Sequence, residues 1–241
     1  MMRIGIAGTQ STEIIAKSVK ETLSDSGFES FHFKNNSKTL TADLVIVLGG
    51  DRGVRNYFHH ALDVDTPVLG ISESESNAFL AQIELKELSM YLKRIKEQNY
   101  IIENVPRIGV KIDGKNVYPV LNDVAVFTSK SATLMEHVLR INDEEVWHDS
   151  SDGVIISTPI GSSAYSMSAG GPVIFQDSNV FGIISVNSLD ITRRPLIVSD
   201  NSLIEIDEIS SRLHCDVAVS YTHLRAHEPL RYLVCRLLLE K

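Results

Sequence analysis

The sequence is poor in cysteine, poor in basic relative to acidic residues, and free of long apolar runs, and each scarcity excludes a class of protein. Its two cysteines, Cys215 and Cys235, lie twenty positions apart without metal-ligand spacing, so neither a disulfide framework nor a zinc site is expected. With 23 Lys and Arg against 31 Asp and Glu, the net charge of −8 disfavours broad binding to nucleic acid or to a membrane surface. An anionic ligand must therefore meet local positive charge, backbone amides or a metal ion.

Export and membrane signals are scarce as well. Residues 1–8 lack the basic start and apolar core of a signal peptide, and no apolar run reaches membrane-spanning length. We therefore expect a cytoplasmic protein. The composition, 43% apolar and 22% charged, is ordinary for a globular fold, and 241 residues form either one large domain or two average ones.

The first hundred residues alternate between apolar runs of strand length and segments of helical periodicity. Four runs are typical of strands and three segments of helices: residues 3–8, 28–33, 42–48 and 67–71, and residues 14–23, 54–62 and 83–98. The run at 42–48 is almost unbroken, as in a strand buried on both faces of a parallel sheet. We predict a doubly wound, Rossmann-like α/β domain over residues 1–100.

Beyond residue 100 the helical periodicity gives way to short strand-like runs. They cover residues 108–112, 117–121, 124–127, 136–141 and 154–157. Asp113-Gly114 is a hairpin turn signal between the first two. We predict a β-rich domain over residues 101–220, closely packed on the first domain with the site between them.

The most unusual stretch is residues 152–172, which read D-G-V-I-I-S-T-P-I-G-S-S-A-Y-S-M-S-A-G-G-P. After the β-branched run the stretch holds small and hydroxyl residues but almost no charge. Small residues let a backbone approach a ligand closely, hydroxyls offer hydrogen bonds, and Tyr165 offers a stacking face. The stretch is either the wall of a ligand site or a Gly/Ser-rich β-bulge region without a ligand.

Two shorter motifs also carry chemistry. Gly49-Gly50-Asp51 follows a buried strand and precedes a helix, where ligands bind in open α/β sheets. Backbone amides there could cradle phosphate while Asp51 accepts a proton or holds magnesium, or Asp51 simply caps the helix. Asn122-Asp123 follows a strand and could hold ribose hydroxyls, or could form an ordinary turn.

These three blocks, in this order, resemble those of the NAD kinase family, in its archaeal and bacterial, ATP- or polyphosphate-dependent type. The resemblance implies a phosphofructokinase-like α/β domain followed by a β-rich domain. It implies transfer of a phosphoryl group to the 2′-hydroxyl of the adenosine ribose of NAD, giving NADP. The resemblance further implies ATP with magnesium as the donor and no tightly bound metal. It also implies a homodimer or homotetramer whose site borrows residues from a neighbour.

The resemblance also assigns site residues. It makes Asp51 the general base, and the residues themselves add Gly49, Gly50 and Arg52 as candidates for binding the phosphates. The NAD site would comprise Asp51, Arg52, Asn122, Asp123, Asp152, Thr158, Ser163, Ala164, Tyr165 and Ser168. Arg193-Arg194-Pro195-Leu196 matches a later block, which we expect to be structural unless an arginine faces phosphate.

The chain departs from the family pattern at several positions. Arg52 stands where the family has glycine, so either its guanidinium clamps phosphate or Gly53 takes over the turn. Ile160 and Ser163 stand where threonine is usual. Because Arg52 lies among the expected phosphate contacts, this departure affects the expectation of ATP as donor more than that of NAD as acceptor. Two other functions stay open: a lipid kinase of the wider G-G-D group, and a non-catalytic NAD(P)-binding or regulatory module.

The last segment differs in kind. The resemblance stops near residue 220, and residues 221–241 resemble translated sequencing-adaptor read-through. We predict that this segment is not native. The alternative is a basic C-terminal helix that starts at Pro229.

Overall fold

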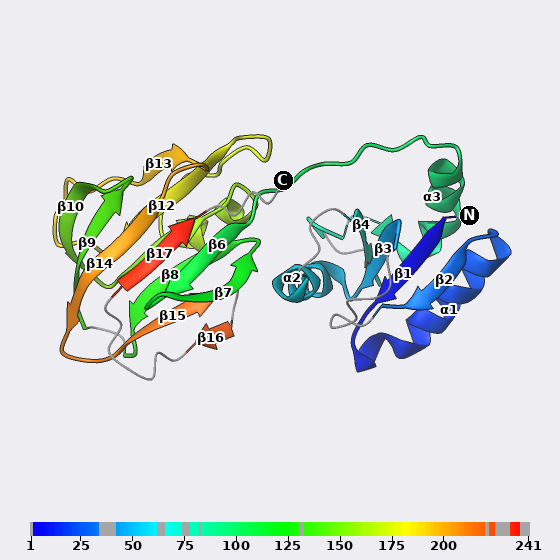
Figure 1. Cartoon of the computed structure of the whole chain (residues 1–241), viewed down its shortest axis with the longest axis horizontal. Helices are drawn as coiled ribbons and strands as arrows, with labels where there is room; N and C mark the ends of the chain where they lie inside the picture. Colours follow the sequence, from blue (N-terminus) through cyan, green and yellow to red (C-terminus); the bar gives the residue numbers. More distant parts are fainter. Residues whose placement is uncertain are drawn as a thin grey trace. The chain divides into compact units, whose positions relative to one another are not determined.

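The computed structural model describes residues 2–33, 42–61, 66–73, 78–81, 83–130, 133–219, 222–224 and 232–236. The chain divides into two compact units, Met1–Asn104 and Val105–Lys241 (Figure 1). Among the helices of the described residues, none combines the length and apolar character needed to cross a bilayer.

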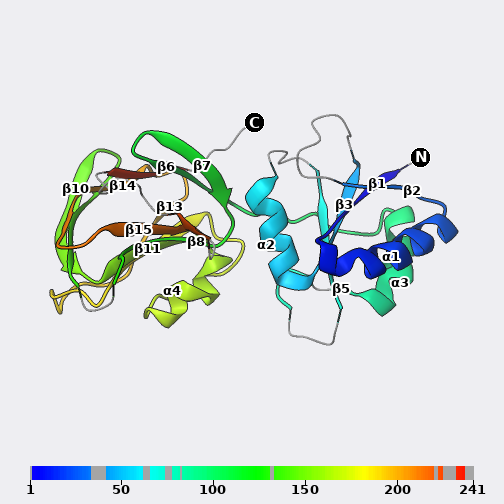
Figure 2. The ribbon, with the colours of Figure 1, turned by 90° about the horizontal axis from the view of Figure 1, so that it is seen from below.

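The N-terminal unit is built on a five-stranded parallel sheet in the order β2-β1-β3-β4-β5. Its strands and helices are β1 (Arg3–Ala7), α1 (Glu13–Asp25), β2 (Glu29–His32), β3 (Leu44–Leu48), α2 (Gly50–His60), β4 (Val68–Ser72), β5 (Ile83–Glu84) and α3 (Leu88–Lys96). Figure 2 shows α2 on one face of the sheet and α1 and α3 on the other. The predicted doubly wound α/β fold is confirmed.

The central strand β3 explains this layering. All of its residues are buried, because successive side chains point to opposite faces and both faces are covered. Ile46 belongs to one apolar cluster with Leu23 of α1 and Leu92 of α3. Val47 belongs to another with Val54 of α2. Because β3 is packed on both faces, the turn that follows it is held in a fixed position.

The single helix predicted for residues 83–98 is wrong at its start. Ile83 pairs in parallel with Ile71 as part of β5, and a 3₁₀ turn (η2, Leu85–Glu87) follows before α3 begins. Glu84 and Glu87 form a reciprocal capping box there. Pairing with a neighbouring strand thus overrides the local helical periodicity.

The C-terminal unit is a sandwich of two six-stranded antiparallel sheets, in the orders β10-β9-β14-β17-β6-β7 and β13-β12-β11-β8-β15-β16. The strands are β6 (Ile108–Ile112), β7 (Lys115–Val120), β8 (Asp123–Thr128), β9 (Met135–Ile141), β10 (Glu144–Ser151), β11 (Gly153–Ser157), β12 (Val180–Val186), β13 (Leu196–Ser199), β14 (Ile204–Ser211), β15 (Cys215–Val219), β16 (Thr222–Leu224) and β17 (Tyr232–Arg236). Leu139, Ile156 and Val217 represent the core that both sheets share. The β-rich expectation is confirmed.

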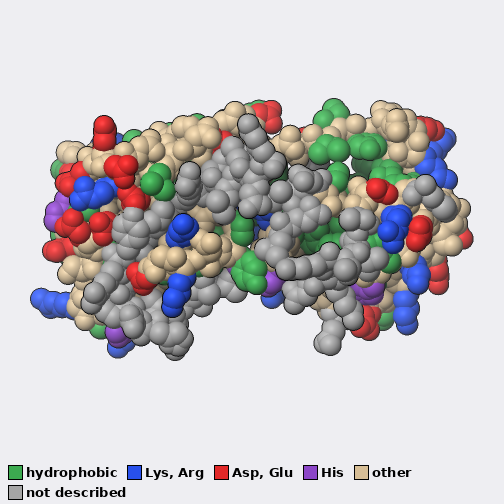
Figure 3. Space-filling view, in the orientation of Figure 1, with side chains coloured by type: hydrophobic (Ala, Val, Ile, Leu, Met, Phe, Trp, Pro, Cys, Tyr) green, Lys and Arg blue, Asp and Glu red, His purple; other side chains and the backbone are tan. Residues whose placement is uncertain are grey.

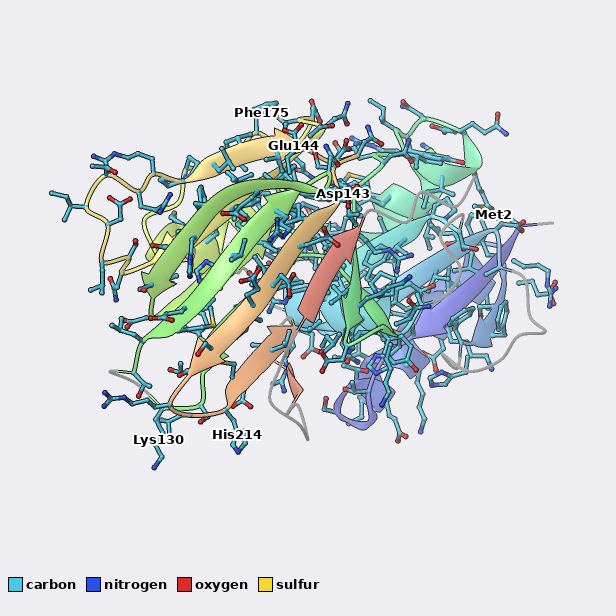
Figure 4. All side chains as sticks on the ribbon, turned by 60° about the vertical axis from the view of Figure 1, so that its left-hand side comes forward. Met2, Lys130, Asp143, Glu144, Phe175 and His214 are labelled. Carbon is cyan, nitrogen blue, oxygen red and sulfur yellow. The ribbon has the colours of Figure 1, made fainter. Side chains whose placement is uncertain are left out.

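Two hairpins of this unit turn on residues with positive φ. The predicted turn at Asp113 and Gly114 is confirmed, with φ of 48° and 78° between β6 and β7. A second turn at Asn142 and Asp143, with φ of 53° and 68°, joins β9 to β10. Figure 4 shows Asp143 at the tip of this hairpin. The sequence analysis did not predict β10 or the strands from β12 to β15.

The outer surface of this hairpin carries charges of both signs. Figure 3 shows acidic and basic side chains interspersed over β9, β10 and β14. There Arg140 lies 3.4 Å from Glu145 and 3.2 Å from Glu208. Exposed pairs of this kind stabilise a fold by little, so the hairpin is held by its strand pairing rather than by charge.

The end of the chain takes part in the sandwich. β17 pairs with β14 on one side and with β6 on the other. The alternative of a C-terminal helix is therefore wrong for residues 232–236. The foreign origin of residues 221–241 stays a prediction.

Candidate functional site

The turn after β3 brings a helix start to the edge of the parallel sheet. Gly49 and Gly50 adopt φ of 97° and 63°, which residues with a side chain rarely adopt, and α2 begins directly at Gly50. A side chain on Gly53 would place its Cβ 2.1 Å from the carbonyl oxygen of Leu48. Gly53 is therefore needed for the close contact between helix and strand. The helix begins earlier than residue 54, so Gly50 and Asp51 lie in its first turn and Gly49 is its N-cap.

Asp51 is fixed by a second turn of the chain. Its Oδ1 accepts hydrogen bonds from the backbone N–H groups of Leu80 and Ala81 at 2.8 and 2.9 Å, and its Oδ2 accepts one from Phe79 at 2.9 Å. Burial alone would raise the pKa of Asp51. The three N–H groups and the nearby Arg55 charge outweigh burial and lower the pKa below its ordinary value. Asp51 is thus an oriented carboxylate.

A cleft of about 530 Å³ lies beside this turn, at the carboxyl ends of β1, β2 and β3. Gly8, Thr9, His32, Gly53, Asn56 and Tyr57 are among its lining residues. The chain leaves β1 toward β2 on one side and returns to β3 on the other, so the cleft lies where the strand order reverses. Open α/β sheets bind ligands at such switch points.

Arg52 is exposed next to this cleft. Within the described part of the chain, no hydrogen bond or ion pair engages its guanidinium. Gly53, by contrast, supplies the close contact described above. The local geometry is therefore consistent with the second of the two readings of this departure, in which Gly53 takes over the turn.

In the C-terminal unit, two motifs far apart in sequence lie against each other. β8 pairs with β11, so Asp123 stands opposite Ser157. The Thr158 hydroxyl donates to the carbonyl of Leu121 at 2.6 Å, and the Thr158 N–H donates to the carbonyl of Asn122 at 2.9 Å. A Cβ on Gly161 would lie 2.0 Å from that same Asn122 oxygen. Only glycine lets the turn approach so closely.

This contact leaves polar groups oriented but unused. Asn122 is 4% exposed, and its Oδ1 has no hydrogen-bond partner among the described residues. Buried polar atoms are normally paired, so an unpaired one marks a place for a ligand or a water molecule. Tyr165 lies close enough for the charge of Asp123 to act on it. Burial first, and then that charge, raises the pKa of Tyr165.

The other predicted residues occupy varied places. Thr158 is fully buried and its hydroxyl bonds the backbone, so it shapes the site. Ser163 donates its hydroxyl to the carbonyl of Ile160 at 3.2 Å, Ala164 precedes the short helix α4 (Tyr165–Ser168), and Ser168 ends it. Asp152 lies at the opposite end of β11 from Thr158. The structure thus brings together Asn122, Asp123, Thr158, Ser163 and Tyr165 but not Asp152.

Some features were missed from sequence. The backbone N–H donors of the turn at 79–81 bind Asp51 across about thirty residues, which no local pattern reveals. His32 could have been found, because it lies one residue before the end of the strand predicted over residues 28–33, on the edge where ligands bind. Ser157 has a buried hydroxyl without a partner in the described part of the chain. Ser166 shares this property, but it belongs to the hydroxyl-rich stretch that was predicted to line the site.

Comparison with known proteins fits this arrangement. The ATP-NAD kinase N-terminal domain family matches residues 7–100, and the ATP-NAD kinase C-terminal domain family matches residues 121–229. An NAD kinase of Nitrosospira multiformis is 32% identical over 202 residues, which are 81% of this chain and 67% of that protein. The chain belongs to the NAD kinase family.

Other relatives in the NAD kinase family are similarly distant. An NAD kinase of Clostridium perfringens is 37% identical over 180 residues, which are 72% of this chain and 64% of that protein. The chain thus matches a little under two thirds of that relative's length. An NAD kinase of Archaeoglobus fulgidus in complex with ATP superposes with a TM-score of 0.80 at 24% identity, covering 99% of this chain and 91% of that one. A yeast NADH kinase complexed with NADH gives 0.82 at 18%, covering 99% and 81%.

One departure from the NAD kinase pattern, and one later block that matches it, have structural explanations. Ile160 is 3% exposed, so it fills the core beneath the turn where a threonine hydroxyl would be buried. Arg193 lies 3.7 Å from Asp149 and 3.3 Å from Asp190, with its guanidinium over the Trp147 ring. These contacts are consistent with the structural role expected for the Arg-Arg-Pro-Leu block.

Proposed function

We propose that this protein is an NAD kinase, which transfers a phosphoryl group from ATP to the 2′-hydroxyl of the adenosine ribose of NAD. The observation that carries the proposal is the contact of Asn122 and Asp123 with the turn at Thr158–Gly161, in which Asn122 Oδ1 is buried and finds no partner among the residues that the structure describes. An amide oxygen beside a carboxylate can accept hydrogen bonds from two ribose hydroxyls. Tyr165 beside Asp123 offers a stacking face for a base. The family relatives named NAD kinase support the same activity.

The donor is assigned to the N-terminal unit. The amides of Gly49 and Gly50 and the start of α2 offer hydrogen bonds and a favourable dipole to phosphate oxygens. The neighbouring cleft, lined by His32, Asn56 and Tyr57, is within the size range of small-molecule sites and is large enough for a nucleoside triphosphate. The complex of the Archaeoglobus fulgidus relative with ATP supports ATP as the donor.

Asp51 takes the role of general base. A carboxylate with a lowered pKa is a weak base, so it accepts the proton only when the hydroxyl is already bonding to phosphorus and has become acidic. The three N–H groups of the turn at 79–81 hold the carboxylate in one orientation. In phosphoryl transfer, most of the rate comes from such positioning and from charge neutralisation.

Magnesium is expected to arrive with ATP. Within the described residues, no group of three His, Cys, Asp or Glu side chains is arranged to hold a metal ion. Magnesium bound to a nucleotide needs only one or two carboxylates besides the phosphates and water. With magnesium carried on the donor phosphates, Asp51 is left to the substrate hydroxyl, because only one lone-pair position of its carboxylate lacks a partner among the described residues. When bound, the ion would neutralise charge on the donor phosphates.

We further propose that the protein forms a homodimer or homotetramer and acts in the cytoplasm. Val173, Phe175, Leu189 and Ile191 are between 65% and 88% exposed, which a second copy would bury. Figure 4 shows Phe175 at the surface of the C-terminal unit. Asp152, at the far end of β11, would then serve either an extended dinucleotide or a neighbour's site. Light scattering coupled to size-exclusion chromatography measures the oligomeric state.

The test is an NADP-formation assay with NAD, ATP and magnesium. It compares the chain as given with a chain whose residues 221–241 are replaced by a family-like ending. NADP formation by either chain supports the proposal. If both fold and bind NAD but transfer no phosphoryl group from ATP or polyphosphate, the protein is a non-catalytic dinucleotide-binding module. Phosphorylation of diacylglycerol or a sphingoid base instead of NAD would identify a lipid kinase.

A further inference from the structure

A buried polar cluster lies in the C-terminal unit away from the proposed ribose contacts. Its centre is Asp149 of β10, whose side chain is 2% exposed. The hydroxyl of Ser188 donates to its Oδ1 at 2.6 Å, the hydroxyl of Ser185 donates to its Oδ2, and Arg193 lies 3.7 Å from Oδ1. A buried carboxylate is costly unless it is paired and hydrogen-bonded, and Asp149 has partners of both kinds.

Arg193, and not histidine, balances this charge. His137 faces Asp149 across the β9–β10 pairing and is fully buried. Burial lowers the pKa of His137 by more than the charge of Asp149 raises it, so its ring is neutral at neutral pH. Arg193 spans the gap from the loop after β12. The ion pair therefore ties that loop to β10.

The same loop holds Asp152. The Asn187 amide donates to Asp152 Oδ2 at 2.8 Å, and the Leu189 N–H donates to the carbonyl of Ser150 at 2.9 Å. Asn187 has φ of 51°, a left-handed conformation that its neighbours must stabilise. Ser188, next in sequence, is the residue that Asp149 anchors. The orientation of the Asp152 carboxylate thus depends on the anchoring of residues 187–193.

We propose that Asp149 is a positioning residue for dinucleotide binding, because through Ser188 and Arg193 it holds the loop whose Asn187 orients Asp152. This inference rests on the proposed function, in which Asp152 contacts NAD. Asp149 itself touches no substrate. Its effect on NAD affinity passes through Asp152 and should vanish when Asp152 is removed.

The test uses Ser188→Ala, which removes one hydrogen bond to Asp149 without leaving a charge unpaired. Ser211→Ala is the matched control, because the Ser211 hydroxyl also binds a distant group, the carbonyl of Leu134 at 3.0 Å, but not this loop. Asp149→Asn is the stronger variant, and Ser188→Ala decides the question if that variant does not fold.

The first measurement is hydrogen exchange in the full chain without nucleotide. Ser188→Ala should accelerate exchange of the N–H groups of Leu189 and Asp152, which bind the carbonyls of Ser150 and Val186. Ser211→Ala should leave both rates unchanged. Unchanged rates in Ser188→Ala would overturn the anchoring step without any reference to activity.

The second measurement is NAD affinity, by calorimetry and by the fluorescence of Trp147, the single tryptophan, which lies under Arg193. Ser188→Ala should weaken binding roughly three- to tenfold, the range expected for one hydrogen bond. The double variant Ser188→Ala/Asp152→Asn should bind no more weakly than Asp152→Asn alone. If the losses of NAD affinity add in the double variant, or if Ser188→Ala binds NAD as tightly as the wild type, this inference is wrong and the proposed function is unaffected. Failure of the wild-type chain to bind NAD would overturn the proposed function, and this inference with it.

Discussion

At the scale of single residues, Asp51 joins two requirements that usually conflict. A general base must accept a proton, yet three backbone N–H groups stabilise the ionised form of Asp51 and make it a weak base. A carboxylate has about four lone-pair positions, and three are occupied here. No described residue occupies the remaining one, on Oδ2. Under the proposed function, this position would align the substrate hydroxyl first and take its proton late.

Asp51→Asn should abolish turnover and leave NAD binding nearly unchanged. Asparagine keeps the shape of the side chain but cannot accept the proton, so we expect a loss of about 10²–10⁴-fold in kcat. Asp43→Asn is the control, since Asp43 also accepts a backbone hydrogen bond, from Arg3 at 2.7 Å, but lies outside the Gly-Gly-Asp turn. Steady-state kinetics and NAD titration measure both effects. Loss of NAD binding in Asp51→Asn would make Asp51 a ligand residue rather than a base.

The lowered pKa of Asp51 also predicts how stability depends on pH. Because the folded pKa lies below the unfolded value near 3.8, the stabilisation is fully present above that value. It is lost as pH falls through the folded pKa. The stability difference between wild type and Asp51→Asn should therefore be constant at neutral pH and shrink in acid below about pH 4. Urea unfolding of both chains at several pH values measures it, and a gap that widens in acid would contradict the assignment.

At the scale of elements, the site of the C-terminal unit depends on a turn pressed against a strand end. Thr158 and Gly161 hold the backbone of Asn122 from two directions, so the position of its side chain is set by another element. Such an arrangement is rigid, because a buried hydroxyl and a missing Cβ leave no room for adjustment. The amide of Asn122 is thus preorganised for a ligand.

Thr158→Val should weaken both the fold and the site. Valine has nearly the same shape but leaves the carbonyl of Leu121 and the N–H of Gly161 without the hydroxyl. We expect the free energy of unfolding to fall by about 1–3 kcal/mol and NAD affinity to fall with it. The control is Thr128→Val, at the end of β8 that lies away from Asn122. It removes a hydroxyl that binds the carbonyl of Lys130 and should leave NAD affinity unchanged. Equal NAD affinity in the two variants would show that the turn at Thr158–Gly161 does not position the NAD site.

The elements also show which structure a sequence can reveal. β3 was predicted because five consecutive apolar residues have few alternatives. β10 was not, because E-E-V-W-H-D-S-S carries no apolar alternation, and its strand form comes from pairing with β9. The motif residues were found by resemblance. The partners of Asp51 could not be, since they are brought to it by the folded chain and donate through backbone groups that any residue has.

At the scale of the whole molecule, the sheets of the C-terminal unit are assembled from distant segments. In the order β10-β9-β14-β17-β6-β7, the hairpin β6–β7 meets the rest of its sheet through β17, which comes from the end of the chain. What matters is that some strand occupies the position between β14 and β6, whether or not residues 221–241 are native.

A chain ending at Ser220 should therefore be much less stable than the full chain. Removing β17 leaves the edges of β14 and β6 unpaired, which exposes backbone N–H and C=O groups and invites aggregation. We expect a fall in the unfolding temperature of the C-terminal unit of roughly 10 °C or more, since each 1 kcal/mol shifts it by about 2–4 °C. Calorimetry on that chain and on one ending at Arg236, which keeps β17, separates this effect from shortening alone. If both chains unfold at the temperature of the full chain, the strand between β14 and β6 contributes nothing. If a family-like ending raises the temperature above that of the full chain, the given segment is a poor substitute for the strand this position requires.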